Sequence, residues 1–232
     1  MNSIVAVQNL SKNYGKKQVL KNLSFTIEPG RVIGLLGENG VGKSTLLKIL
    51  ADLYKAGEGQ VLINNKPVST LTHGEVSYMM EISNLYSWMK VSHAIDYYAD
   101  MYPDFDKEKA LLLCEQLSLN PKELLRKLSK GNQERVLLLL TISRRVPLYL
   151  LDEPIAGLDP GIKRNIIQII LKNINEDASV IIASHLLRDL EEIFDEVFIL
   201  HDHQLITANA DEIREKRHQS VEEFYMEVTK NA

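Results

Sequence analysis

The chain has 232 residues, of which 45% are hydrophobic and 25% charged, and its formal net charge is −4. This length and composition are those of a soluble globular protein with a substantial core, and we expect one domain over residues 1–232. Lysines and glutamates are interspersed without a basic stripe, so the sequence disfavours DNA or RNA as the main partner.

Two further features bear on where in the cell the chain works and on whether it spans a membrane. The single cysteine, Cys114, cannot form an intrachain disulfide, which favours a reducing, cytosolic compartment. The longest apolar run, residues 136–142, is far shorter than the ~20 residues that a membrane-spanning helix needs. We therefore expect any membrane role to require a partner chain.

The first part of the chain predicts strands. Polar and apolar residues alternate in "IVAVQNL" and "LSFTIEPG", and "GQVLINNKPV" has a hairpin-like Asn64-Asn65 between extended pieces, so we expect short, largely antiparallel strands. "RVIGLL" (31–36) is a nearly continuous apolar run, typical of a strand covered on both faces. Glycines and then "STLLKIL", which has helical spacing, follow this run.

The middle of the chain changes in character. From about residue 82 to 128 the pattern has helical periodicity, with breakers at Pro103 and Pro121, and we expect an inserted helical subdomain at about 82–135. Beyond it, "VPLYLLDEP", "SVIIAS" and "EVFIL" predict strands that alternate with helices, and two short helices are expected at about 210–230. The alternation predicts an α/β fold with a mostly parallel core sheet, an N-terminal antiparallel β subdomain and the helical insertion.

A glycine-rich loop stands between the predicted strand and helix. "GENGVGKST" (37–45) matches the phosphate-loop pattern G-x-x-x-x-G-K-[ST], in which backbone N–H groups turn inward onto phosphate oxygens at a helix N-terminus. Lys43 is expected to reach the β and γ phosphates, and the Ser44 hydroxyl to bind Mg²⁺. A simple glycine turn that caps a helix is the alternative. The expected nucleotide-binding residues are Gly37, Asn39, Gly40, Gly42, Lys43, Ser44 and Thr45.

Two acids end the buried strand predicted in "LYLLDEP". Asp152 is expected to hold Mg²⁺ through water, and Glu153 to polarise the attacking water as a general base. Such a pair taken alone is also consistent with a solvated strand end. Beside a phosphate loop, it predicts nucleotide hydrolysis on a P-loop NTPase core.

These motifs, in this order and over nearly the whole chain, resemble those of the ATPase subunits of ABC transporters. The resemblance implies an enzyme that uses ATP and Mg²⁺, with two copies of the subunit enclosing two nucleotides. It also implies a role for Tyr14, in "KNYGKKQVL", because the family has an aromatic residue there that stacks on adenine. The alternative for Tyr14 is an ordinary strand tyrosine.

"LSKGNQER" is similar to the signature sequence of the family, usually written LSGGQ. The resemblance implies that Ser129 and Gly131 bind the γ phosphate of a nucleotide held on the other subunit. Two positions depart from the common form, since Lys130 replaces a glycine and Asn132 a glutamine. Ser129 also suits the N-cap of the helix that follows, so a purely local role is the alternative.

Three more positions take their roles from the resemblance. Asp159, in "AGLDP", corresponds to a residue that helps to link the two sites of a dimer, and it also suits a helix N-cap before a proline. His185, in "IIASHLL", corresponds to a histidine that contacts the γ phosphate. Glu81 lies where the family has a glutamine; a glutamate there can ligate Mg²⁺ or orient water, and is otherwise a solvated loop acid.

The stretch "NLYSWMKVSHAIDYYADMYPDFD" is rich in aromatic residues. The resemblance implies that this region receives short coupling helices from a membrane permease, and Tyr86, Trp88 and Met89 suit such a contact. Trp88 suits the core of the helical subdomain equally well. Tyr97 and Tyr98 are expected in that core.

This stretch and the closing "SVEEFYMEVT" are most similar to the stand-alone ATPases of bacterial exporters for drugs and antimicrobial peptides. We therefore expect a homodimer, or a heterodimer with a sibling ATPase, on the cytoplasmic face of the cell membrane. There it would drive a separate permease that exports a peptide, drug or other amphipathic compound. An importer ATPase is the main alternative. A non-transport member is disfavoured, because translation factors of the family usually carry two such domains and repair proteins a long coiled coil.

Overall fold

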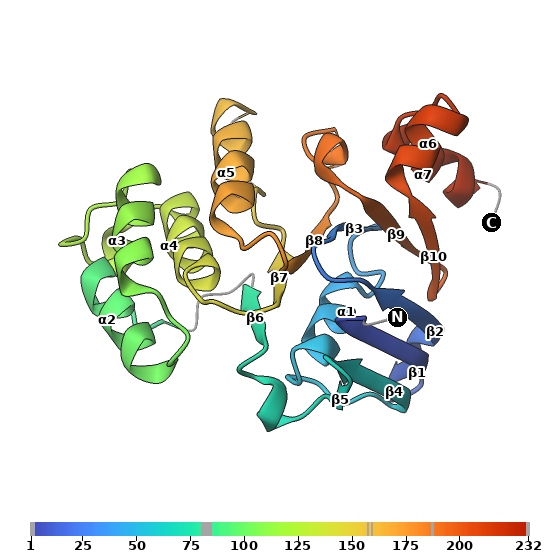
Figure 1. Cartoon of the computed structure of the whole chain (residues 1–232), viewed down its shortest axis with the longest axis horizontal. Coiled ribbons are helices and arrows are strands. Elements are labelled where there is room, and N and C mark those ends of the chain that lie inside the picture. The colour runs from blue at the N-terminus through green and yellow to red at the C-terminus, as the bar shows by residue number, and fades with distance from the viewer. Residues whose placement is uncertain (1–2, 80–84, 157, 159, 187, 231–232) are drawn as a thin grey trace.

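The computed structural model describes residues 3–79, 85–156, 158, 160–186 and 188–230 (Figure 1). Within these residues the strands form two sheets, one of four strands and one of six. The four-stranded sheet has the order β2-β1-β4-β5 and is antiparallel throughout. Its strands are β1 (Val5–Tyr14), β2 (Lys17–Ile27), β4 (Glu58–Ile63) and β5 (Lys66–Pro67).

The hairpin predicted at Asn64-Asn65 is confirmed. Ile63 of β4 pairs with Lys66 of β5, and the two asparagines between them have φ values of 50° and 61°. A two-residue turn with both residues in the left-handed region matches the twist of an antiparallel pair, and asparagine tolerates that region well.

The six-stranded sheet has the order β10-β9-β3-β8-β7-β6. All of its pairings are parallel except the one between β9 and the edge strand β10. These strands are β3 (Val32–Leu36), β6 (Val76–Met79), β7 (Leu148–Asp152), β8 (Ser179–Ser184), β9 (Glu196–His201) and β10 (Gln204–Asn209). The predicted α/β fold with a mostly parallel core sheet and a separate antiparallel sheet is confirmed.

The helices follow the predicted pattern. α1 (Lys43–Leu50) comes directly after the glycine loop, and α2 (Val91–Met101), α3 (Lys107–Gln116) and α4 (Lys130–Ile142) lie together at one end of the molecule (Figure 1). The remaining helices are α5 (Pro160–Asn173), α6 (Ala210–Lys216) and α7 (Val221–Lys230). Short 3₁₀ turns cover Thr70–Thr72, Leu125–Lys127 and Glu191–Ile193. Among the described residues, none of these helices has the length and apolar character needed to cross a bilayer.

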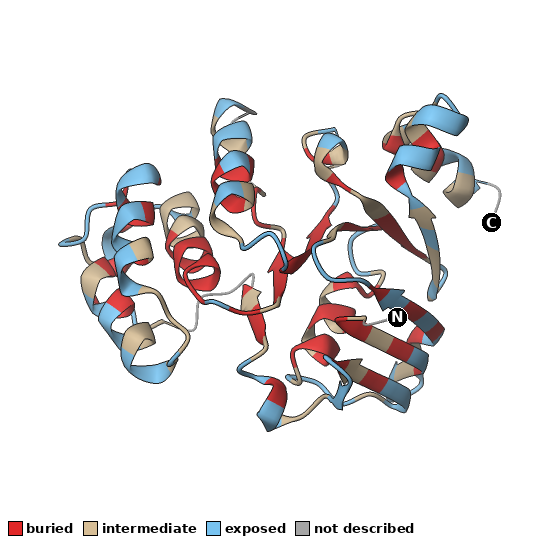
Figure 2. Ribbon diagram, in the orientation of Figure 1, coloured by how far each residue is buried: buried red, intermediate tan, exposed pale blue. Residues whose placement is uncertain are grey.

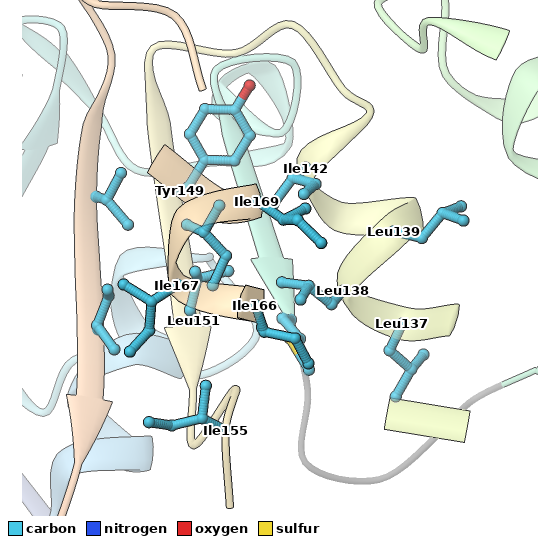
Figure 3. Packing of buried hydrophobic residues seen from close by; sticks show 14 of the residues in the cluster. Leu137, Leu138, Leu139, Ile142, Tyr149, Leu151, Ile155, Ile166, Ile167 and Ile169 are labelled. Atoms are coloured by element: carbon cyan, nitrogen blue, oxygen red, sulfur yellow. The ribbon is translucent and has the colours of Figure 1, made fainter. Parts of the chain in front are cut away.

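Burial differs between the two sheets (Figure 2). Every residue of β7 and β8 is buried, as expected for parallel strands covered on both faces, whereas β1 and β2 mix buried and exposed positions. Figure 3 shows the main cluster around β7, where Tyr149 and Leu151 share a core with side chains from α4 and α5. The parallel strands are therefore held in place from both sides.

A buried arginine joins the helical end of the molecule to the core sheet. Arg144, just after α4, donates two hydrogen bonds to Asp104, at 2.8 and 2.7 Å, and one each to the backbone oxygens of Val76 (2.7 Å) and His73 (2.9 Å). Its guanidinium also lies 4.1 Å from the ring centroid of Tyr102. The planar fork of arginine suits this bidentate and stacked arrangement, which fixes α4 to the start of β6.

Two expectations for the aromatic stretch are wrong. Met89 is only 6% exposed and belongs to the main buried cluster, so it is not a surface contact. Tyr97 is 39% exposed and is not a core residue. Tyr98 is partly buried against the main cluster as expected, and this burial raises the pKa of its phenol to about 12.

Candidate active site

The glycine loop joins β3 to α1 through backbone conformations that favour glycine. Gly37 has φ 150°, and a Cβ there would lie 2.5 Å from the carbonyl oxygen of Leu200. Gly42 has φ 123° and is the N-cap of α1, with no side chain capping the helix. Because the glycine N-cap offers no side-chain acceptor to the first N–H groups of α1, this end of the helix suits an anion such as a phosphate.

Lys43, the first residue of α1, is held inside this loop. Its Nζ donates to the backbone oxygens of Gly37, at 2.7 Å, and Glu38, at 3.1 Å, and the residue is only 6% exposed. Burial lowers the pKa of Lys43, while the nearby carboxylates of Glu153 and Asp152 act in the opposite direction. An incoming phosphate would offer this buried ammonium stronger acceptors than two neutral carbonyls.

The two predicted acids stand at the carboxyl end of β7. Asp152 is 3% exposed, and one of its oxygens accepts a hydrogen bond of 3.3 Å from the hydroxyl of Tyr78 on β6. Glu153 follows with φ 51°, an uncommon conformation for a residue with a side chain, and its N–H donates to the oxygen of Ala183 at 2.9 Å. This turn directs the chain away from β7 as soon as the strand ends.

Glu153 is held by two neighbours from the end of β8. Its Oε1 lies 2.8 Å from Nδ1 of His185, and its Oε2 accepts a hydrogen bond of 3.2 Å from Ser184 Oγ. The sequence does not predict Ser184 as a site residue. Neither strand alone marks Ser184 as a partner of Glu153, because their proximity depends on how β7 and β8 pair.

Residues of the phosphate loop line one cleft of about 410 Å³ together with Asp152, Glu153 and His185. The structure therefore brings together the phosphate loop, both acids and His185, which are widely separated in the sequence. Its described lining residues are Asn39, Gly40, Gly42, Lys43, Ser44, Thr45, Met79, Lys130, Glu134, Asp152, Glu153, Ala156 and His185.

The residues of the cleft also fit Mg²⁺. Ser44 and Asp152 both line it and supply hydroxyl and carboxylate oxygens, which are the donors that Mg²⁺ prefers. Among the described residues, no group of three or more histidine, cysteine and acidic side chains gathers as a metal cage. This combination fits an ion that is held mainly by phosphate oxygens and water, with few protein ligands.

The predicted signature residues lie at the start of α4. Ser129 is its N-cap and accepts a hydrogen bond from the N–H of Asn132 at 3.3 Å, so the local role is confirmed. A Cβ on Gly131 would lie 3.4 Å from Leu158. Neither Ser129 nor Gly131 is among the described residues that line the cleft, whereas Lys130 and Glu134 are.

Of the other predicted residues, one lies away from the cleft and two fall outside the described residues. Tyr14 ends β1, is 45% exposed and meets Tyr54 edge to face, with ring centroids 6.2 Å apart. It is not among the described residues of the phosphate cleft. Glu81 and Asp159 lie outside the residues that the structure describes, so their predicted roles stay predictions.

A comparison with protein families finds a match to the model described as ABC transporter, over residues 20–156. Among solved structures, an ATP-binding subunit of an ABC transporter superposes with a TM-score of 0.86 and 26% identity, covering 98% of this chain and all of that one. The sequence similarity and the shared architecture agree with the motifs in the cleft.

The names of three curated relatives state different roles. The chain is 32% identical to the ABC transporter ATP-binding protein YtrB of Bacillus subtilis, covering 92% of this chain and 74% of that protein. It is 31% identical to the SkfA peptide export ATP-binding protein SkfE of the same organism, covering 88% and 87%. It is 30% identical to the ribose import ATP-binding protein RbsA of Caldanaerobacter subterraneus, covering 89% of this chain but only 45% of that protein.

Proposed function

As this chain belongs to the ABC transporter ATP-binding family, whose members hydrolyse ATP in transport, we propose that it drives a separate membrane permease and that the direction of transport is export. One observation carries the ATPase mechanism. The phosphate loop, Asp152, Glu153 and His185 line the same cleft, although they come from three different stretches of sequence.

In this proposal the phosphate loop binds the nucleotide and Glu153 activates water. The N–H groups at the start of α1 and the ammonium of Lys43 hold the β and γ phosphates. Glu153 accepts a proton from the attacking water, and its contacts with Ser184 and His185 keep both of its oxygens in fixed positions. Ser44 and Asp152 would hold Mg²⁺, which when bound neutralises negative charge on the phosphates.

We propose a dimer in which the start of α4 of one copy completes the site of the other. Ser129 is exposed at this helix N-terminus, which suits a phosphate from a second chain. Asp159 is proposed to link the two sites and Tyr14 to stack on adenine. The exposure of Tyr14 at the end of β1 supports the stacking role.

A groove between the helical end and the core sheet supports docking of a permease segment. The groove has a volume of about 320 Å³. Its wall contains Tyr97, Tyr98, Tyr102 and Arg144, the buried arginine that pairs with Asp104. Near it along the chain, Tyr86 and Trp88 are stacked 5.8 Å apart and are 58% and 62% exposed. Exposed aromatic rings of this kind are favoured at protein interfaces. Through this contact the chain would sit on the cytoplasmic face of the membrane.

Export is favoured over import by the extent of the similarity. SkfE, whose name gives peptide export, is covered over 87% of its length, and this chain over 88% of its own. Less than half of RbsA, whose name gives ribose import, is covered. Import stays the second candidate because RbsA is aligned over most of this chain. ATP-driven uptake of a compound into inside-out vesicles that contain the permease would support export, whereas uptake only into right-side-out vesicles would support import.

The ATPase mechanism is tested on the purified chain. We expect Glu153→Gln to lower the rate of ATP hydrolysis in the presence of Mg²⁺ by roughly 100-fold or more, since a general base usually contributes at least that much. Glu58→Gln, an exposed position on β4, is the matched control and should hydrolyse ATP normally. Normal hydrolysis by Glu153→Gln would overturn the assignment of the base.

A further inference from the structure

The segment that follows β8 begins with His185 and continues to a turn at Asp189. The side chain of His185 is 44% exposed, although its Nδ1 lies 2.8 Å from Glu153 Oε1. Because an exposed side chain has rotational freedom, the place of the imidazole beside Glu153 depends on how the backbone of this segment is held. Leu190 is buried in the main cluster and fixes the far end of the segment.

An ion pair joins this segment to α5. Lys163, in the first turn of α5, donates a hydrogen bond from Nζ to Asp189 Oδ2 at 2.8 Å. The side chains of Lys163 and Asp189 are 13% and 30% exposed, so solvent screens their attraction less than that of an exposed pair. Helix α5 is itself fixed, because Ile166 and Ile167 are buried in the main cluster (Figure 3). The pair therefore connects the segment to a rigid part of the core.

A second ion pair joins the same segment to α7. Arg188 Nε lies 2.6 Å from Glu222 Oε2, but the side chain of Arg188 is 82% exposed. An exposed pair of this kind usually contributes little. Arg188 and Asp189 are adjacent in sequence, so the chain offers a mostly buried connection and an exposed one at nearly the same point of the backbone.

We propose that Lys163 is a positioning residue for ATP hydrolysis and that it acts through Asp189 on His185. The inference rests on the proposed function and adds to it a side chain that is not among the described residues of the cleft lining. With the ion pair in place, the segment stays beside α5 and the imidazole stays in contact with Glu153. Without the pair, the segment samples other conformations, and one oxygen of the base loses its fixed position. Misplacement of a catalytic group lowers the rate of the chemical step.

Steady-state ATP hydrolysis in the presence of Mg²⁺ tests this role. Lys163→Met should lower kcat about tenfold, because the segment loses its connection to α5, and should change KM for ATP less than twofold, because the phosphate loop is untouched. Lys163→Arg keeps the charge and should hydrolyse ATP at close to the wild-type rate. Arg188→Met is the matched control and should also leave kcat unchanged. A wild-type kcat for Lys163→Met, or equal losses for Lys163→Met and Arg188→Met, would overturn the proposal.

A double-variant cycle separates positioning of His185 from a general effect on the fold. In a His185→Ala background, Lys163→Met should lower the single-turnover rate less than twofold further, since the imidazole on which it acts is absent. Asp189→Asn breaks the same pair from the other end and should behave in the same way in both backgrounds. A full further loss in the His185→Ala background would show that Lys163 does not act through His185.

The same measurements distinguish a failure of this inference from a failure of the ATPase function. Wild-type hydrolysis that is lost in Glu153→Gln, together with a normal kcat in Lys163→Met, would remove only the role of Lys163. Absence of Mg²⁺-dependent hydrolysis by the wild-type chain would remove the function on which the inference rests.

Discussion

At the scale of single residues, the site depends on how Glu153 is held. Its φ of 51° follows immediately after β7, and both carboxylate oxygens have partners from the end of β8. A residue in this uncommon conformation persists only when its surroundings fix it. The hydrogen bond from the N–H of Glu153 to Ala183 holds the backbone, and Ser184 and His185 hold the carboxylate, so we regard Ser184 as a positioning residue for the base.

Removal of the Ser184 hydroxyl tests this role. Ser184→Ala should lower kcat for ATP hydrolysis about tenfold, because a hydrogen bond to a charged group is lost, while KM for ATP stays within twofold. Ser179→Ala, at the other end of β8, removes a buried serine that bonds to Glu28 and should leave kcat unchanged. A wild-type kcat for Ser184→Ala would show that His185 alone positions the base.

The site residues that the sequence predicts are those in local motifs. The phosphate loop needs consecutive residues with particular backbone freedom, so a stretch of nine residues is enough to predict Gly37, Gly42 and Lys43. Ser184 and Glu134 have no such local pattern. Ser184 approaches Glu153 because Asp152 pairs with Ala183 in a parallel register, which cannot be read from either strand alone.

Among the secondary-structure elements, the strongly patterned segments are predicted and two strands are missed. β6 has only four residues and lies just before the helical part, so its pattern is too brief to separate from its surroundings. β10 follows a turn made by Asp202 and His203, both with positive φ, and such a turn lacks the usual glycine signal. The sequence therefore places the parallel core but not the two edge strands.

The exposed ring of Trp88 gives a prediction at this scale. Trp88→Ala should abolish transport when the chain is combined with its permease, because a large exposed aromatic side chain is lost from the proposed docking surface. ATP hydrolysis by the isolated chain should stay within twofold of wild type, since Trp88 is 62% exposed and is not part of the described cleft lining.

Leu71 provides the control for Trp88. It is 84% exposed and lies in the turn between β5 and β6, so Leu71→Ala also removes an exposed apolar side chain. Transport should persist in Leu71→Ala. Normal transport by Trp88→Ala in reconstituted vesicles would exclude the proposed contact.

At the scale of the whole molecule, Arg144 connects the helical end to the core sheet. Its side chain is 6% exposed and its partner Asp104 21% exposed, and loss of one member of a buried pair leaves the other without compensation. Arg144→Met should therefore lower the free energy of unfolding by about 3 kcal/mol, measured by urea denaturation.

The neighbouring arginine is a matched control. Arg145 pairs with Asp106 but its side chain is 68% exposed, so Arg145→Met should hardly move the midpoint of urea unfolding. Equal shifts of the midpoint for the two variants would mean that Arg144 does not hold the two parts of the molecule together.

In the proposed mechanism, ATP bound in the cleft brings two copies of the chain together and hydrolysis releases them. Sedimentation of the Glu153→Gln chain measures this most directly, because the bound ATP persists. We expect a monomer without nucleotide and with ADP, and a dimer with ATP and Mg²⁺. A chain that stays monomeric at every ATP concentration would contradict it.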